Sequence, residues 1–217
     1  MAFRRQPFVN HLLVWVCLAA LPAVAEPPVL SRVLAGVESR YNRARTLQVR
    51  FQETYLQGRN RRTESGALSL RKPGRMRWEY SSPPGKLFVS DGKFLYLYLP
   101  SSNRVEKMKA KESEDLRAPL AFLLGRLDFG RDFARFESHA EDSGLWVRAE
   151  PKSASLPYLA VEFVVAPDYR IRRVRVTGQD RSVFDFQFEE EKVNPPIDDK
   201  IFRFTPPPGA EVVESGG

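Results

Sequence analysis

Residues 66–100 read GALSLRKPGRMRWEYSSPPGKLFVSDGKFLYLYLP, and this stretch decides the fold. Side chains in a β-strand alternate between its two faces. Met76, Trp78 and Tyr80 therefore share one face, while the charged residues between them share the other. The stretch predicts strands with one apolar face and one charged face.

Turn sequences separate these strands and make them antiparallel. Pro-Gly pairs end two of the strands, because both residues favour turns over extended ladders. The pair Asp91-Gly92, between two apolar runs, predicts a two-residue type I′ hairpin turn, in which both central residues take a positive φ. Consecutive strands are therefore expected to pair as hairpins.

The rest of the chain carries the same alternation, with two helical interruptions. Apolar residues at helical spacing predict an amphipathic helix over 30–41, and leucines three and four apart predict one or two short helices within 115–136. Further strands are predicted at 47–55, 68–70, 145–150, 158–165, 171–177, 183–188 and 201–205. Runs of antiparallel strands with segregated helices indicate an α+β domain, in which helices cover a curved sheet.

The N-terminal residues have the three-part order of a secretory signal peptide. Two arginines precede an apolar run over 12–21, and an Ala-Val-Ala sequence at 23–25 supplies small residues for cleavage. The run is shorter than the roughly 20 apolar residues of a membrane span. We expect residues 1–25 to be removed as a signal peptide and residues 26–217 to form one soluble, exported domain.

The expected mature chain has little of the chemistry that enzymes use. Its only cysteine, Cys17, leaves with the leader, and His139 remains as the single histidine. Cysteine nucleophiles and metal sites built from cysteine and histidine are therefore excluded. The net charge of +5, from 32 basic and 27 acidic residues, is spread over the strands. Nucleic-acid binders instead gather basic residues in a stripe, so we expect no nucleic-acid partner.

Paired carboxylates leave one enzymatic alternative open, a carboxylate-based hydrolase. Glu79, Glu162 and Asp185 lie on predicted strands, where a solvated face explains them. Asp91 and Asp168 fit turns, which favour aspartate. We therefore expect neither enzymatic activity, nor a cofactor, nor a metal ion.

A set of short segments follows the predicted N-terminal helix in a distinctive order and spacing. They are FQE at 51–53, GALSL at 66–70, KP at 72–73, RWEY at 77–80, VSDGK at 89–93, LYLY at 95–98 and FRFTPP at 202–207. Together they cover nearly the whole expected mature chain. In this order they resemble the LolA family of periplasmic carriers of outer-membrane lipoproteins.

The resemblance implies an unclosed antiparallel β-barrel of about eleven strands, with short helices as a lid over an apolar cavity. The cavity would take the acyl chains of a triacylated lipoprotein from an inner-membrane ABC-type transporter and pass them to an outer-membrane acceptor, with the carrier acting as a monomer. The cavity-lining residues implied are Leu47, Val49, Phe51, Leu68, Leu70, Met76, Trp78, Tyr80, Phe94, Tyr96 and Tyr98. The lid residues implied are Val33, Leu34, Val37, Leu120, Leu123 and Leu124.

The lid contact departs from the family pattern. An arginine usually precedes the strand-ending proline and hydrogen-bonds the lid, whereas this chain has Lys72 in that place and Arg71 before it. Lysine lacks the planar five-donor fork of arginine. Either residue is expected to hold the lid, Lys72 more weakly than an arginine would. Within the same fold, a carrier or sensor of other lipids or glycolipids is the alternative function.

Overall fold

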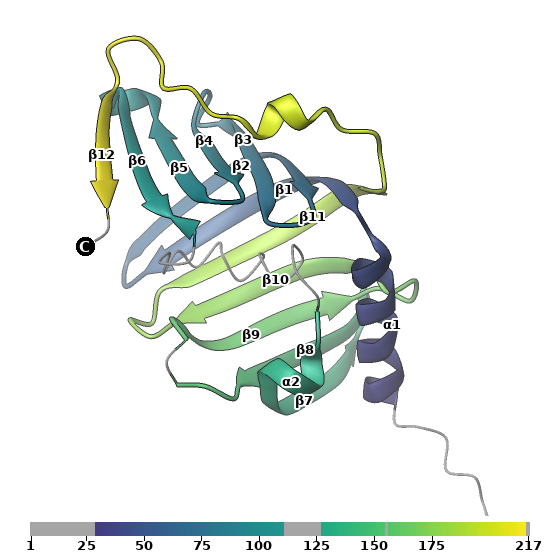
Figure 1. Ribbon diagram of the computed structural model, residues 1–217. Coiled ribbons are helices and arrows are strands. Elements are labelled where there is room, and N and C mark those ends of the chain that lie inside the picture. Colours follow the sequence, from purple (N-terminus) through teal and green to yellow (C-terminus); the bar gives the residue numbers. More distant parts are fainter. Residues whose placement is uncertain (1–28, 111–126, 155, 216–217) are drawn as a thin grey trace, which may run out of the picture.

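A computed structural model of the chain describes residues 29–110, 127–154 and 156–215 (Figure 1). Helix α1, Val29–Arg43, forms where the apolar spacing predicts it. Arg40 and Arg43 occupy its last turn, where cations offset the partial negative charge of the helix end. Val37 and Tyr41 are its buried residues, and they place one stripe of the helix against the sheet.

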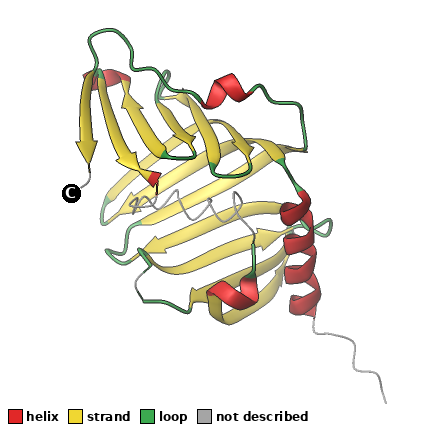
Figure 2. Cartoon of the chain, viewed as in Figure 1, coloured by secondary structure: helices red, strands yellow, loops and turns green. Residues whose placement is uncertain are grey.

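A single curved sheet of twelve strands makes up most of the remaining structure (Figures 1 and 2). Its strands are β1 (Thr46–Gln57), β2 (Asn60–Arg71), β3 (Arg75–Ser82), β4 (Leu87–Asp91), β5 (Phe94–Leu99), β6 (Arg104–Lys109), β7 (Phe133–Glu141), β8 (Gly144–Pro151), β9 (Tyr158–Val165), β10 (Ile171–Gly178), β11 (Val183–Val193) and β12 (Glu211–Ser215). In space they run β12-β6-β5-β4-β3-β2-β1-β11-β10-β9-β8-β7.

Every neighbouring pair of strands is antiparallel except β12 and β6, which are parallel. Within the described ranges the outermost strands, β12 and β7, are not paired with each other. The sheet is therefore unclosed, as the sequence predicts, with twelve strands in place of about eleven.

The hairpins form where the turn sequences predict them, with one difference in turn type. Gln57 and Asn60 face each other across Gly58 and Arg59, which form a hairpin tip. Gly92 has a φ of +97°, but Asp91 is not among the positive-φ residues, so the predicted type I′ turn is wrong. Asp91 instead accepts hydrogen bonds from the backbone N–H groups of Lys93 and Phe94, which fixes a wider turn.

The short helices correct two of the predicted elements. They are η1 (Pro100–Ser102), α2 (Phe129–Asp132) and η4 (Asp199–Phe202). The strand expected at 201–205 is wrong, because the Asp198 carboxylate accepts from the Lys200 N–H and starts the 3₁₀ turn of η4. Of the helical region expected over 115–136, residues 111–126 lie outside the description, α2 is helical, and β7 begins at Phe133.

One hydrophobic cluster joins the inner face of the sheet to α1 and to the residues around α2. Among the described residues, no helix has the length and apolar character needed to cross a membrane. The outer face of β3 to β6 is covered by the C-terminal segment, which passes through η4 and then adds β12 beside β6 (Figure 1).

Candidate functional site

The inner, concave face of the sheet presents rows of mostly apolar side chains. Directly opposed residues of neighbouring strands lie on the same face of a sheet. One row runs Val49, Leu68, Trp78, Phe88 and Leu97 across five strands. A second row runs Leu47, Leu70, Met76, Ser90, Leu95 and Met108 beside it. The alternation of each strand thus produces an apolar wall.

Aromatic rings pack at the centre of this wall because a glycine leaves room for them. Gly66 lies opposite both Phe51 and Tyr80, whose ring centroids are 5.1 Å apart in an edge-on contact. Phe51 also meets the ring of Trp78 at 4.7 Å. A Cβ on Gly66 would lie 2.1 Å from the Glu79 carbonyl oxygen, so no larger residue fits. The glycine therefore fixes both the close strand approach and the aromatic cluster.

The other half of the sheet continues the same wall. Val147, Phe163, Val174 and Phe186 are opposed in turn across β8, β9, β10 and β11. All four are buried, and Phe186 lies 5.4 Å from the Trp78 ring. Both halves of the sheet consequently contribute to one apolar surface.

The structure places most of the predicted cavity residues on this wall and three of them elsewhere. Buried on the wall are Leu47, Val49, Phe51, Leu68, Leu70, Met76, Trp78 and Tyr80. In contrast, Phe94, Tyr96 and Tyr98 lie on the opposite, convex face, because Tyr96 is opposed to Val89 and Leu97 to Phe88. Tyr96 stacks on Phe204 of the C-terminal segment at 5.2 Å. The alternate residues Leu95 and Leu97 take the inward positions.

Helix α1 contributes the described part of the predicted lid. Val37 belongs to the same buried cluster as Trp78, and Val33 and Leu34 are half-buried against it. Gly36 lies against the ring of Tyr169, where an added Cβ would come within 2.3 Å of a ring carbon. The helix is therefore seated closely on the β9–β10 turn. The other predicted lid residues, Leu120, Leu123 and Leu124, lie outside the described residues.

Of the two residues proposed to lock the lid, Lys72 contacts α1, and Arg71 contacts the C-terminal segment. The Lys72 ammonium donates a 2.8 Å hydrogen bond to the Tyr41 carbonyl oxygen at the C-terminal end of α1. A cation suits this position because helix ends carry partial negative charge. Burial lowers the pKa of Lys72, since the charged form is disfavoured away from water. Arg71 instead forms an ion pair with Asp199 at 2.9 Å and bonds the Ile197 carbonyl, both in the C-terminal segment.

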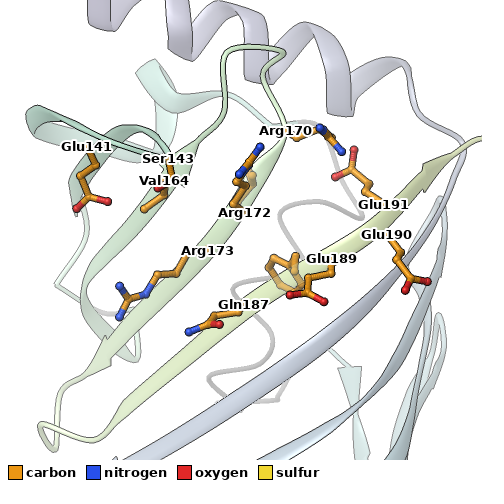
Figure 3. A pocket seen from close by; sticks show the side chains of 12 residues that line it. Glu141, Ser143, Val164, Arg170, Arg172, Arg173, Gln187, Glu189, Glu190 and Glu191 are labelled. Atoms are coloured by element: carbon orange, nitrogen blue, oxygen red, sulfur yellow. The ribbon is translucent and has the colours of Figure 1, made fainter.

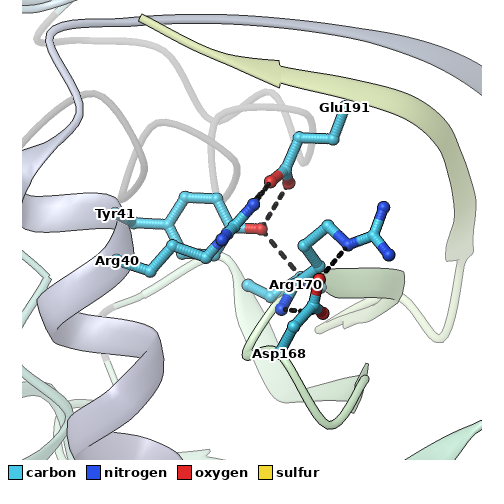
Figure 4. A network of polar contacts seen from close by, with 6 residues as sticks. Arg40, Tyr41, Asp168, Arg170 and Glu191 are labelled. Carbon is cyan, nitrogen blue, oxygen red and sulfur yellow. Dashed lines mark hydrogen bonds and ion pairs between the residues drawn. The ribbon is translucent and has the colours of Figure 1, made fainter.

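Further polar contacts hold α1 at the edges of β10 and β11 (Figure 4). Arg40 and Tyr41 both donate to Glu191, with Arg40 Nη2 at 2.6 Å from Oε1 and the Tyr41 hydroxyl at 2.6 Å from Oε2. The Tyr41 oxygen also accepts the backbone N–H of Ile171 at 2.9 Å. Burial and the Glu191 charge raise the pKa of Tyr41, so the hydroxyl stays protonated and continues to donate.

The segment leading into α2 is tied to the opposite side of the helix. The Asn42 side chain donates to the Leu127 carbonyl at 2.8 Å and accepts the Leu127 N–H at 2.7 Å. The Glu38 carboxylate accepts the Phe129 N–H at 2.7 Å. Polar groups thus anchor α1 on two sides, while its apolar stripe faces the wall.

A buried charged cluster, not anticipated from the sequence, ends the apolar wall at the side away from α1. Glu53 accepts the Tyr80 hydroxyl at 3.0 Å, and Lys86 forms an ion pair with Glu64. The Lys86 ammonium also lies 4.2 Å from the centroid of the Tyr80 ring. These acids stand two and four positions from inward apolar residues of β1 and β2. Each acid occupies a position where the strand alternation predicts an inward, apolar residue, and this is the sequence signal that identifies it.

The carboxylates considered for a hydrolase take part in contacts on the outer surface. Glu162 pairs with Arg148 at 2.8 Å, Asp185 with Arg173 at 2.5 Å, and Glu79 with Arg77 at 3.0 Å. Asp168 accepts the Arg170 guanidinium in a turn. His139 is stacked on Trp146 at 4.4 Å. Structural ion pairs and turns therefore explain these groups, and in the described residues no three metal-ligating side chains converge.

Comparison with known proteins places this geometry in a family. The model of the family described as outer membrane lipoprotein carrier protein LolA matches residues 42–205. An outer-membrane lipoprotein carrier protein of Dechloromonas aromatica is 26% identical over 211 residues, covering 96% of this chain and 99% of the relative. One of Xanthomonas axonopodis pv. citri is 31% identical over 160 residues, covering 72% and 75%.

A solved structure shares the fold. An uncharacterized conserved protein from Thermus thermophilus superposes with a TM-score of 0.50 at 18% identity, covering 86% of this chain and 99% of that one. At this level of identity the likeness concerns the fold alone.

Proposed function

The chain belongs to the LolA family of outer membrane lipoprotein carrier proteins, and on that premise we propose that it carries triacylated lipoproteins across the periplasm. Residues 1–25 serve as the export signal and are removed. The acyl chains come from an inner-membrane ABC-type transporter and pass to an outer-membrane acceptor. The carrier acts as a monomer, and no covalent bond is made or broken.

The apolar concave wall beneath α1 is the observation that carries this proposal. It joins both halves of the sheet with the stripe of α1 in one cluster. Hydrocarbon chains require apolar surroundings, because an acyl chain gains about 0.8 kcal/mol per buried CH₂. A long chain therefore represents on the order of 10 kcal/mol of transfer free energy, most of which a carrier must supply.

Release requires that this affinity be limited, and α1 supplies a competitor. Val33, Leu34 and Val37 pack on the wall in the described structure. An acyl chain that takes the same surface must displace these side chains, and the net gain on binding is smaller by that amount. The polar anchors at Lys72 and Glu191 return the helix to the same place after release.

The test replaces one half-buried wall residue by a carboxylate. Leu97→Glu introduces a charge opposite Phe88, where an acyl chain would have to desolvate it. Val212→Glu is the matched control, since Val212 is an apolar strand residue on the convex face and 45% exposed. Native mass spectrometry of each protein, purified from the periplasm, measures the bound lipoprotein.

We expect the control to carry lipoprotein and Leu97→Glu to be empty, with equal circular dichroism spectra. Normal loading of a folded Leu97→Glu variant would refute the proposed binding surface. A bound mass corresponding to free lipid or glycolipid, in place of lipoprotein, would support the alternative cargo on the same fold.

A further inference from the structure

Strands β10 and β11 separate at the end of the sheet that lies beside α1 (Figure 3). Their paired residues run from Thr177 and Val183 to Arg173 and Gln187. Beyond that point β11 continues to pair with β1 as far as Val193. A pocket of about 430 Å³ lies between the separated strands. We call this pocket the slot.

Irregularities on both strands create the slot. The register of β10 with β9 shifts between Ile171 and Arg173, which leaves Arg172 as an extra residue. The register of β11 with β1 shifts between Gln48 and Arg50, and Glu190 has a φ of +54° there. Bulges bend a strand, redirect its side chains and are common next to functional sites. Both bulges lie beyond the last paired residues of β10 and β11, where these two strands separate.

The inner end of the slot is lined by residues of the apolar wall. Ile171 and Phe188 both line the slot. Ile171 also belongs to the buried cluster of the concave face, and Phe188 packs against that cluster. Figure 3 shows arginines of β10, including Arg172, on one bank and carboxylates of β11, including Glu190, on the other. The inner end of the slot is therefore apolar. Its two sides, formed by β10 and β11, offer both hydrogen-bond donors and acceptors.

The end of the slot beside α1 is closed by Tyr41. Its hydroxyl accepts the Ile171 N–H from one bank and donates to Glu191 on the other. The bridge depends on α1, so displacement of the helix would open the slot at this end. The opposite end stays closed by the paired strands.

We propose that the slot holds the polar polypeptide that follows the acylated residue of the cargo; this rests on the proposed function. The acyl chains lie on the wall, but the polypeptide joined to them carries peptide groups that resist burial among apolar side chains. A polar passage from the wall to the surface solves this problem. Opening of the Tyr41 bridge admits the polypeptide sideways, and its closure retains it.

Site-specific photo-cross-linking tests the proposal. The probe is a synthetic tripalmitoyl-cysteinyl lipopeptide with a long tail of mixed charge. The photoreactive residue p-benzoylphenylalanine replaces Arg172 or Glu190, both exposed on the banks, or Leu97 on the wall, or Val212 on the convex face. We expect Arg172 and Glu190 to cross-link to the peptide tail, Leu97 to the lipid part, and Val212 to neither.

The cross-linking results distinguish the role of the slot from the proposed carrier function. Cross-linking from Leu97 without any from Arg172 or Glu190 would overturn the slot and leave the carrier function standing. Absence of cross-linking from all positions would overturn both.

A second measurement addresses the bridge. Tyr41→Phe keeps the ring and removes the hydroxyl that joins the banks. Loss of hydrogen bonds of this kind should accelerate dissociation of the tailed lipopeptide about five- to tenfold more than dissociation of a tail-less tripalmitoyl-cysteine ester. Equal acceleration of both ligands would contradict the slot, because Tyr41 would then act on the helix alone.

Discussion

The two ends of the concave wall are buried alike and differ in chemistry. Beside α1, Leu70 and Met76 are 3% and 2% exposed; at the other end, Glu64 and Lys86 are 5% and 3% exposed. Alternation along a strand determines which way a side chain points but not its polarity. An inward position can therefore belong either to a hydrocarbon surface or to a charged boundary of that surface.

The boundary limits the apolar depth of the wall. Along β1 the inward residues Leu47, Val49 and Phe51 are apolar, and the next, Glu53, is an acid. At about 3.3 Å per residue, the apolar part of this strand is roughly 13 Å long. Hydrocarbon placed further along the strand would meet buried charge.

The largest expected effect comes from placing a charge at the apolar end. In the wild-type protein the Trp78 indole N–H donates a hydrogen bond to the Met76 sulfur. Met76→Glu buries a carboxylate in place of that sulfur. An uncompensated buried charge should lower the free energy of unfolding by about 3 to 5 kcal/mol. Urea denaturation measures this, with the volume-conserving Met76→Leu as the control.

The sign of its pH dependence sharpens this prediction. Burial raises the pKa of the introduced carboxyl above its value in the unfolded chain. The folded variant therefore binds a proton more readily than the unfolded one, and its deficit relative to the wild type shrinks as the pH falls through that raised pKa. A deficit equal to that of Met76→Leu at neutral pH would mean that water reaches this end of the wall.

Removing a charge at the other end should have the next largest effect. Lys86→Met removes one of the two cations that pair with the buried Glu64 carboxylate and leaves only Arg62, which is largely exposed, so we expect a loss of about 1 to 3 kcal/mol in unfolding free energy. The double variant Lys86→Met/Glu64→Leu should recover most of it, because replacing a whole buried pair by apolar residues is often neutral. A double variant as unstable as the single one would show that the carboxylate itself supports the fold.

The smallest effect is expected at the lid contact. Lys72→Arg keeps a cation near the Tyr41 carbonyl and adds donors, which should change stability by less than about 1 kcal/mol and slow cargo release. Because burial lowers the pKa of Lys72 below its unfolded value of about 10.4, the contribution of Lys72 to the unfolding free energy should rise as the pH approaches that unfolded value, and this rise should vanish in the arginine variant. Thermal unfolding at each pH measures the stability, and a release assay measures the rate at which cargo leaves. Unchanged release would mean that Lys72 makes a purely structural contact.

The sequence predicts the strands with clear alternation and fails where both faces look the same. Every residue of β5 is apolar or aromatic, so its alternation contains no information about which face is inward. The register through β4 decides it, and places Leu95 and Leu97 inward and Tyr96 outward. The edge strand β7 is difficult for another reason, because most of its residues after Phe133 are exposed and it lacks an apolar period.

Packing at a distance explains the remaining differences. Phe202 and Phe204 have the alternation of a strand, but they belong to a segment that packs on the convex face. The Asp198 cap and the following prolines hold that segment out of the sheet. Likewise, nothing local to β10 or β11 indicates the slot, since its two bulges form against different partner strands, one against β9 and the other against the distant β1.

The pairing of β1 with β11 also governs how the chain reaches this structure. Strands β1 to β6 form one meander of short-range contacts and β7 to β11 another, whereas β1 and β11 lie far apart in the sequence. Joining the meanders closes a long loop, and such non-local steps slow folding. During synthesis the first meander emerges early with the edge of β1 unpaired, a surface prone to aggregation until β11 arrives. The strand that completes the wall is thus also the one that ends this vulnerable stage.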